Sequence, residues 1–151
     1  MKLKNVKAVL IVIMALLCFA STFSVVSMAA EDAFGYSFKV KAKMKKSYAN
    51  DSRQRTTGRT DNPWKVELSY TGEGKGSMNY FFIAKTWNKD ECSRMYGVAQ
   101  GTGPHYYRAL ENAQNQYVTL GARNNNNNED TFTISGYWDE EIGRILPDLP
   151  A

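Results

Sequence analysis

The sequence predicts an all-β protein, a single antiparallel β-sandwich of about six or seven strands with at most one short helix. After residue 33, apolar and polar residues alternate in six segments, the period-two pattern of half-buried strands. Stretches rich in glycine, proline and asparagine separate these segments and predict turns. Helical periodicity is weak in the same part of the chain. Short strands joined by turns favour two antiparallel sheets packed together.

The clearest alternation lies on either side of a glycine-rich stretch. Every second residue is apolar from Trp64 to Tyr70, and the alternation resumes from Met78 to Lys85. Three glycines between the two runs supply the backbone freedom that a turn needs. Two alternating runs across such a turn predict a β-hairpin.

The first residues of the chain have the pattern of a secretory signal peptide. Lys2, Lys4 and Lys7 precede an apolar run over 8–20, and small residues stand at Ala29 and two positions before it. The apolar run has about 13 residues, fewer than the roughly 20 that span a bilayer. We therefore expect a signal peptide over 1–29, a secreted extracellular domain with a short C-terminal tail over 30–151, and no stable membrane insertion.

The high isoelectric point belongs largely to this leader. The leader carries three lysines and no acidic residue, so its removal lowers the formal net charge from +4 to +1. A nearly neutral mature domain gives no reason to expect a nucleic-acid partner.

The first two segments of the mature domain are rich in basic residues. The range Phe34 to Met44 is predicted as one long strand, because large apolar residues alternate there with polar ones. Lys39, Lys41 and Lys43 would form its solvated face. The next segment, Asn50 to Asn62, has no large apolar residue and is predicted to be a long exposed loop.

The remaining segments continue the strand pattern with one interruption. Arg94 to Gln100 is predicted as a weak strand, and apolar spacing over His105 to Gln114 predicts two or three turns of helix. Strands are predicted again over Gln116 to Arg123 and Thr131 to Trp138. The five asparagines at Asn124 to Asn128 predict an exposed loop between them.

Charge is distributed unevenly along the mature chain. The range 36–65 has nine basic and two acidic residues, whereas 129–148 has six acidic residues and one arginine. A basic face on a secreted protein is attracted to anionic envelope polymers and lipid headgroups. The alternative is that the two regions neutralise each other within the fold. The first interpretation predicts a binding site at Lys41, Lys43, Lys45, Arg53, Arg55 and Arg59.

The residues that could carry catalysis are few. Cys92 and His105 are the one cysteine and the one histidine of the mature chain, and the acidic neighbours of Cys92 would raise its thiol pKa. The consecutive acids of 139–141 are predicted to form a solvated acidic turn, and the 124–128 loop lacks the ligand spacing of a calcium site. We therefore expect a non-enzymatic protein with no metal and no cofactor. Cys92 would be a free thiol or a bridge between chains.

Several short motifs together resemble a known family. They are the opening GYSFKVKA, the RQRTTGRT loop, the QGTGPHYY turn, and YVTLGARNNN followed by TFTISGYWDEE. These motifs resemble those of a family of small secreted proteins of unknown function from Gram-positive bacteria. The leader, the size, the aromatic-rich strands and a tryptophan near the end are also similar to lactococcin-like bacteriocins, which implies a β-sandwich.

Two functional hypotheses follow. The first is a bacteriocin-like protein that acts at the bacterial cell envelope through its basic strand and loop. The alternative is an extracellular binding module for a wall glycan or a protein partner, which would use exposed aromatic side chains such as Trp87, Tyr106 and Tyr107. A hydrolase ranks last, because the sequence offers it no site.

Overall fold

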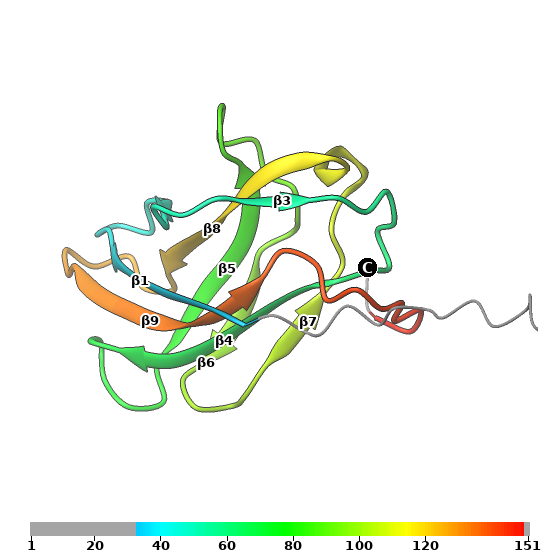
Figure 1. Ribbon diagram of the computed structural model, residues 1–151. Coiled ribbons are helices and arrows are strands. Elements are labelled where there is room, and N and C mark those ends of the chain that lie inside the picture. Colours follow the sequence, from blue (N-terminus) through cyan, green and yellow to red (C-terminus); the bar gives the residue numbers. More distant parts are fainter. Residues whose placement is uncertain (1–32, 150–151) are drawn as a thin grey trace, which may run out of the picture.

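Two antiparallel sheets pack face to face in the computed structural model, which describes residues 33–149 (Figure 1). The predicted all-β sandwich is therefore confirmed, while the predicted signal peptide over 1–29 lies outside the described residues. No helix within residues 33–149 is long and apolar enough to span a membrane. The strands are β1 (Phe34–Val40), β2 (Ser47–Tyr48), β3 (Arg53–Arg55), β4 (Trp64–Thr71), β5 (Met78–Lys85), β6 (Tyr96–Ala99), β7 (His105–Tyr107), β8 (Gln116–Asn124) and β9 (Phe132–Asp139), with a 3-10 turn, η1, at Glu111–Ala113.

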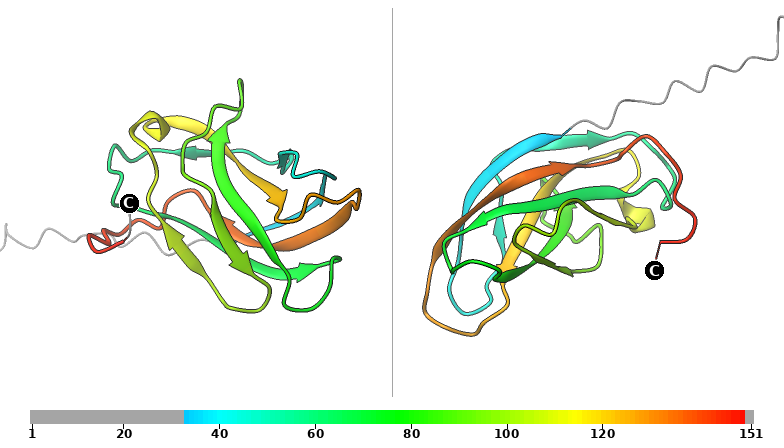
Figure 2. Two further views of the ribbon diagram at one scale, coloured as in Figure 1. Left: turned by 180° about the vertical axis from the view of Figure 1, so that it is seen from behind. Right: turned by 90° about the horizontal axis from the view of Figure 1, so that it is seen from below.

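The two sheets have different strand orders. The four-stranded sheet runs β1-β9-β4-β7, so β9 lies between β1 and β4. The five-stranded sheet runs β2-β8-β5-β6, and β3 also pairs with β8. Figure 2 shows the five-stranded sheet from behind, with β5 in front. The six predicted strands correspond to the six longer ones, and β2, β3 and β7 are additions of two or three residues each.

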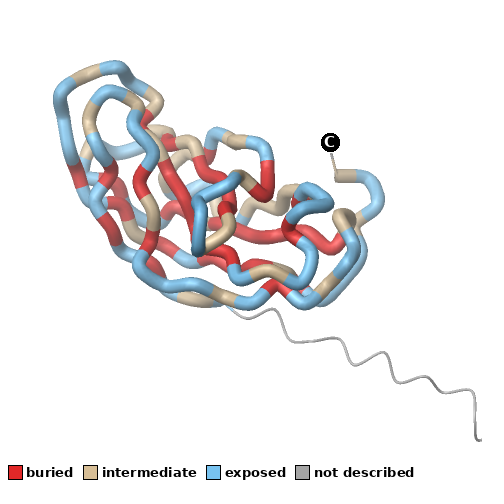
Figure 3. The backbone as a smooth tube through the Cα atoms, turned by 90° about the horizontal axis from the view of Figure 1, so that it is seen from above, coloured by how far each residue is buried: buried red, intermediate tan, exposed pale blue. Residues whose placement is uncertain are grey.

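The core lies between the inner faces of the two sheets. Alternate residues of the long strands point inward, so buried positions recur at every second residue along β1 and most of β9. Figure 3 shows buried and exposed stretches interleaved along the tube. Trp64 is fully buried, and its ring centroid lies 5.3 Å from that of Tyr107. The largest fully buried apolar side chains are Trp64, Trp138, Phe81, Phe82, Leu68, Ile83, Leu120, Ile134 and Ile142.

The predicted hairpin is wrong, although both of its strands are right. β4 and β5 have the predicted bounds, but β4 pairs with β9 and β7, whereas β5 pairs with β8 and β6. The glycine-rich link therefore carries the chain from one sheet to the other. Phe81 and Phe82 are both fully buried, so β5 has two covered faces and is an inner strand of its sheet.

The first predicted strand is too long. β1 ends at Val40, and Lys43 and Met44 adopt left-handed backbone conformations with φ of 56° and 53°. The amide N–H of Lys43 donates to the carbonyl oxygen of Asn128 at 2.7 Å, which ties this turn to the β8–β9 loop. Apolar and lysine residues thus keep alternating through a turn, where the alternation has no structural meaning.

The predicted helix over His105 to Gln114 is also wrong. His105–Tyr107 form β7, an edge strand beside β4, and the single 3-10 turn η1 follows. Stacking of Tyr107 on Tyr96, with ring centroids 3.9 Å apart, holds this segment extended against Trp64. The tertiary contact outweighs a weak helical spacing.

Two strand glycines provide a test of the close contact between β9 and β4. A Cβ atom at Gly136 would lie 1.9 Å from the carbonyl oxygen of Glu67, whereas one at Gly35 would meet nothing within 4 Å. We expect Gly136→Ala to lower the free energy of unfolding by about 1–3 kcal/mol or more, because a backbone atom must move. The matched Gly35→Ala change should leave it equal or raise it slightly. Urea denaturation of both variants is the measurement, and equal stabilities would contradict the close approach.

Candidate functional site

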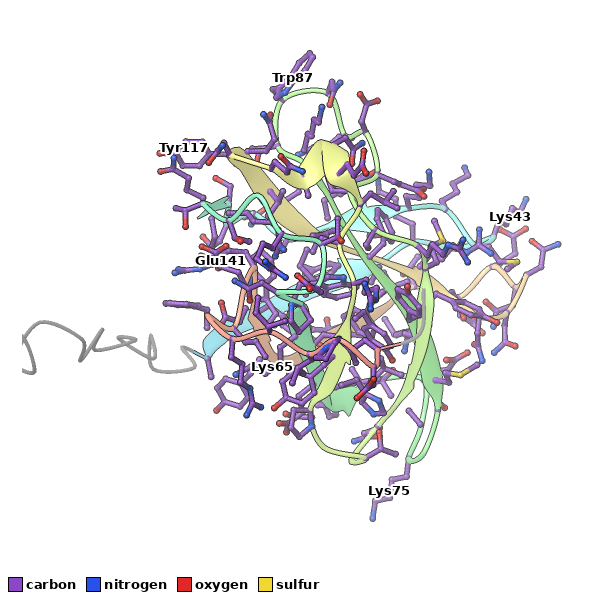
Figure 4. The ribbon with its side chains drawn as sticks, turned by 90° about the vertical axis from the view of Figure 1, so that its right-hand side faces the viewer. Lys43, Lys65, Lys75, Trp87, Tyr117 and Glu141 are labelled. Carbon is purple, nitrogen blue, oxygen red and sulfur yellow. The ribbon has the colours of Figure 1, made fainter. Side chains whose placement is uncertain are left out.

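The three predicted lysines lie in one exposed turn after β1. Lys41, Lys43 and Lys45 are all exposed, and none is on a strand. Lys43 forms a 2.7 Å ion pair with Glu129 across two well-exposed side chains. Figure 4 shows Lys43 at the edge of the molecule. The lysine part of the predicted site therefore exists as a basic turn rather than as a strand face.

The three predicted arginines are placed differently, because the segment from Asn50 to Asn62 is not an exposed loop. It contains β3, which pairs with β8. Arg53 lies over the ring of Phe34 and forms a 2.5 Å ion pair with Glu140. Arg59 is exposed and forms a bidentate pair with Asp61 at 2.8 and 2.9 Å.

Arg55 is the centre of this segment and is 1% exposed. Its guanidinium donates to the backbone carbonyl oxygens of Glu140 at 2.5 Å, Arg59 at 2.8 Å and Asn62 at 2.5 Å. Burial lowers the pKa of Arg55, and the negative charges of Glu141 and Glu140 oppose this. Arg55 therefore holds the 53–62 segment against the end of β9 and is not accessible to an envelope component.

The acidic residues at the end of β9 are not the solvated turn that the sequence predicts. Asp139 and Glu140 are 3% and 7% exposed. The Glu141 carboxylate accepts hydrogen bonds from the backbone N–H groups of Thr56 and Thr57 at 3.1 and 2.8 Å. As the alternative interpretation expects, acids from the end of the chain pair with Arg53 and lie near Arg55 within the fold, whereas Arg59 pairs with Asp61 of its own segment.

Asp139 is the most perturbed acid of this cluster. It lies opposite Lys65 in the register of β9 and β4, and its Oδ2 atom is buried without a hydrogen-bond partner among residues 33–149. Burial raises the pKa of the Asp139 carboxyl to about 7, and the charge of Glu140 adds to the rise. A hydrogen bond from the backbone of Glu141 and the charges of Lys65 and Arg53 oppose the rise without cancelling it.

The outer face of the five-stranded sheet carries cations over aromatic rings. Arg123 of β8 lies over Tyr80 of β5, with 5.6 Å to the ring centroid. The ammonium group of Lys46 lies 5.8 Å from the ring of Phe82. The ammonium group of Lys89 lies 5.1 Å from the ring of Tyr48. We call this surface the basic–aromatic face. It consists of Lys46, Tyr48, Tyr80, Lys89 and Arg123, and the fully buried ring of Phe82 lies beneath it.

Local packing fixes the rings of this face. The tip of the Phe82 ring lies against Gly121 of the neighbouring strand, where a Cβ atom would be 2.4 Å from the ring. Tyr48 of β2 meets Phe82 edge-on with centroids 5.8 Å apart. Lys46 also forms an ion pair with Glu91. The rings and cations thus form one connected surface across three strands.

Two exposed aromatic side chains stand where this face ends. Trp87 is 75% exposed and Tyr117 is 57% exposed, and the N–H of Thr86 donates to the carbonyl oxygen of Tyr117 at 2.9 Å. Trp87 points away from the molecule (Figure 4), on a turn in which Lys89 has a φ of 62°. A tryptophan held in this way is available for contact with a ligand or a surface.

The other two aromatic residues singled out from the sequence behave differently. Tyr107 is stacked on Tyr96 and belongs to the packing around Trp64 rather than to a free surface. Tyr106 is half-buried, with the guanidinium of Arg144 5.7 Å from its ring. Sequence reasoning missed Lys46, Lys89 and Arg123 as partners of aromatic rings, although two apolar faces on β5 indicated that its second face is also covered.

Cys92 and His105 have separate partners. Cys92 is a free thiol with no exposed surface, and burial raises its pKa. The Nε2 atom of His105 lies 2.7 Å from the hydroxyl of Thr102. Within residues 33–149 no group of three histidine, cysteine or acidic side chains is arranged to hold a metal ion.

In the asparagine loop, Asn124 is fully buried and bonds to Asn128 and Asn126.

Comparison with known proteins identifies the family of this chain. A family model described as "Protein of unknown function (DUF2712)" matches residues 24–142. The chain belongs to this family. No curated protein and no solved structure matches it. The resemblance to a family of unknown function is thus confirmed at that level, and Gram-positive origin and likeness to bacteriocins stay predictions.

The DUF2712 match spans every strand from β1 to β9. The Arg55 cluster and the basic–aromatic face therefore both lie within the family domain. The Arg55 cluster stabilises the fold, whereas the basic–aromatic face is a surface that can bind a ligand. Each therefore leads to a different experiment.

Replacement of Arg55 tests whether its hydrogen bonds stabilise the fold. We expect Arg55→Met to lower the free energy of unfolding by about 3–5 kcal/mol, because three carbonyl groups lose their donor and the buried acids lose a cation. Arg59→Met removes an arginine from the same segment, but its ion pair is exposed and screened, so the urea midpoint should not change. A midpoint for Arg55→Met equal to that of the parent protein would contradict the structural role.

The raised pKa of Asp139 predicts how stability depends on pH. In the unfolded chain this carboxyl loses its proton near pH 4, whereas in the folded protein it keeps the proton up to about pH 7. The folded state therefore binds more protons between these values, and the free energy of unfolding should fall as pH rises from about 4 to 7. Asp139→Asn should remove this slope, and Asp148→Asn, in the exposed tail, should retain it. Urea denaturation at each pH is the measurement, and an unchanged slope in Asp139→Asn would disprove the assignment.

Proposed function

We propose that this protein is a secreted, non-enzymatic module that binds an anionic component of the Gram-positive cell envelope through its basic–aromatic face. The observation that carries the proposal is the set of three cation–ring pairs on one outer sheet face, together with the exposed Trp87 at its end. The buried thiol of Cys92 and the separate partner of His105 favour binding over catalysis.

The charges of this face favour an anionic partner. Lys46, Lys89 and Arg123 lie on it, and the basic turn at 41–46 adjoins it because Ser47 of β2 pairs with Ala122, next to Arg123. Glu91 forms an ion pair with Lys46, and Glu129 forms one with Lys43 of the basic turn. Cations remain in excess, so the face attracts an anionic surface and is sensitive to salt.

The aromatic rings make the face more than a positive patch. A ring beneath a cation keeps the cation in place without neutralising it, so the charge stays available to a phosphate or carboxylate. Trp87 and Tyr117 add apolar contact at the end of the face. The proposal thus retains the lysine turn of the predicted site and leaves out Arg53, Arg55 and Arg59, which bind partners within the fold.

Binding to isolated Gram-positive cell walls tests the proposal. Residues 30–151 should sediment with walls at 50 mM NaCl and be released at 500 mM NaCl. Lys45→Gln/Lys89→Gln/Arg123→Gln should weaken binding about a hundredfold, because each cation near an anionic surface contributes about 1 kcal/mol. The control Lys39→Gln/Lys75→Gln/Arg59→Gln removes the same charge from exposed residues elsewhere and should bind as the parent does.

Two outcomes would overturn this assignment. Equal losses in the two triple variants would show that net charge alone is responsible, and no sedimentation at 50 mM NaCl would remove the envelope target. Vesicles with and without an anionic lipid separate lipid headgroups from wall polymers. In a parallel assay with growing Gram-positive indicator cells, a bacteriocin-like action requires inhibition by the parent protein and not by the Lys45/Lys89/Arg123 variant. Wall binding without growth inhibition would refute the bacteriocin-like action but leave the proposed envelope binding intact.

A further inference from the structure

The outer face of the four-stranded sheet contains a shallow trough on the side opposite the basic–aromatic face. It consists of two pockets of about 390 and 200 Å³, and the side chain of Tyr137 lines both. Gly35 and Ser37 of β1 and Ser135 of β9 line the larger pocket, and Glu67 of β4 lines the smaller. The trough therefore crosses at least three adjacent strands.

Strand register explains how the trough forms. Gly35, Tyr137 and Glu67 lie side by side in one cross-strand row, so the ring of Tyr137 has no side chain next to it on β1. A Cβ atom at Gly35 would meet nothing within 4 Å, which shows that the space is open. In the next row Ser37 pairs with Ser135, so the floor beside Tyr137 stays low and polar.

A bulge in β4 adds a second aromatic ring. The register with β9 shifts between Leu68 and Tyr70, and both Ser69 and Tyr70 are exposed as a result. Tyr70 pairs with Ser135, one row away from Tyr137, and the two tyrosines are 52% and 49% exposed. The hydroxyl of Ser69 donates to the Glu67 carboxylate at 3.2 Å. The ring of Tyr137 thus lies in a trough with hydroxyl and carboxylate groups, and the exposed Tyr70 lies at its border, across from Ser135.

We infer that this trough binds an uncharged oligosaccharide. Flat tyrosine rings pack against the apolar faces of sugar rings, and the serine hydroxyls and Glu67 bond to sugar hydroxyls. The charge of the trough favours an uncharged chain over an anionic one, because Glu67 and Lys65 both line the smaller pocket and their opposite charges balance. A protein partner would need a larger apolar core than two half-exposed tyrosines on a polar floor provide.

This binding site goes beyond the proposed envelope function, and it uses a different face, different residues and a different chemical class of ligand. Binding here depends on ring contact and hydrogen bonds, so it is insensitive to salt, whereas the basic–aromatic face loses its ligand at high salt. The two assignments can therefore fail separately.

Titration of residues 30–151 with cellohexaose and with the N-acetylglucosamine hexamer, followed by calorimetry and by amide NMR shifts, is the test. We expect binding to at least one sugar at both 50 and 500 mM NaCl, with the largest shifts at the trough. Tyr137→Ala should weaken binding at least tenfold, and Tyr117→Ala, an exposed tyrosine on the five-stranded sheet, should not weaken it.

A second pair of variants guards against a folding effect. Gly35→Leu should fill the open space and abolish sugar binding without loss of stability, whereas Thr133→Leu, exposed on β9 of the same sheet but outside the trough, should bind as the parent does. The Lys45/Lys89/Arg123 variant should also retain sugar binding. No binding of either sugar at millimolar concentration, or equal losses in Tyr137→Ala and Tyr117→Ala, would overturn the inference.

Discussion

The buried guanidinium of Arg55 is the constraint on which the arrangement of this end of the sandwich depends. A charged group without solvent needs hydrogen-bond acceptors, and here three backbone carbonyl groups from two distant parts of the chain supply them. Because one of these is the carbonyl of Glu140, the 53–62 segment must lie against the end of β9. Burial of Asp139 and the capture of Arg53 by Glu140 follow from that position.

The position that Arg55 imposes on the 53–62 segment also determines where positive charge stays exposed to solvent. The arginines of the basic half of the sequence bind acids or carbonyl groups within the fold, so the surface they would have formed is absent. Lys46, from the other part of this basic half, reaches the outer face of the five-stranded sheet, where Lys89 and Arg123 also lie over aromatic rings. One face of the sandwich is therefore basic with fixed aromatic rings, and the opposite face is polar and hollowed around Tyr137.

Period-two alternation predicted the fold class and, to within a residue, the bounds of β4, β5, β8 and β9, because it reports which side of a strand is buried. It does not report which strand lies alongside, and so β4 and β5 were assigned to one hairpin although they belong to different sheets. Arg55 was predicted to be exposed to solvent for a related reason. Its acceptors are backbone carbonyls, which leave no trace in the sequence. The basic–aromatic face also escaped prediction, because Lys46, Lys89 and Arg123 come from three separate elements.

The position of β9 has a consequence for how the chain folds. β9 is the last strand in the sequence, yet it lies between β1 and β4 and pairs Phe34 with Trp138. A chain that emerges N-terminus first therefore holds β1 and β4 with no strand to join them until Asp139 has appeared. Their long-range pairing makes early folding unfavourable. In a chain exported as proposed, this order of strands prevents the four-stranded sheet from forming until β9 has crossed the membrane.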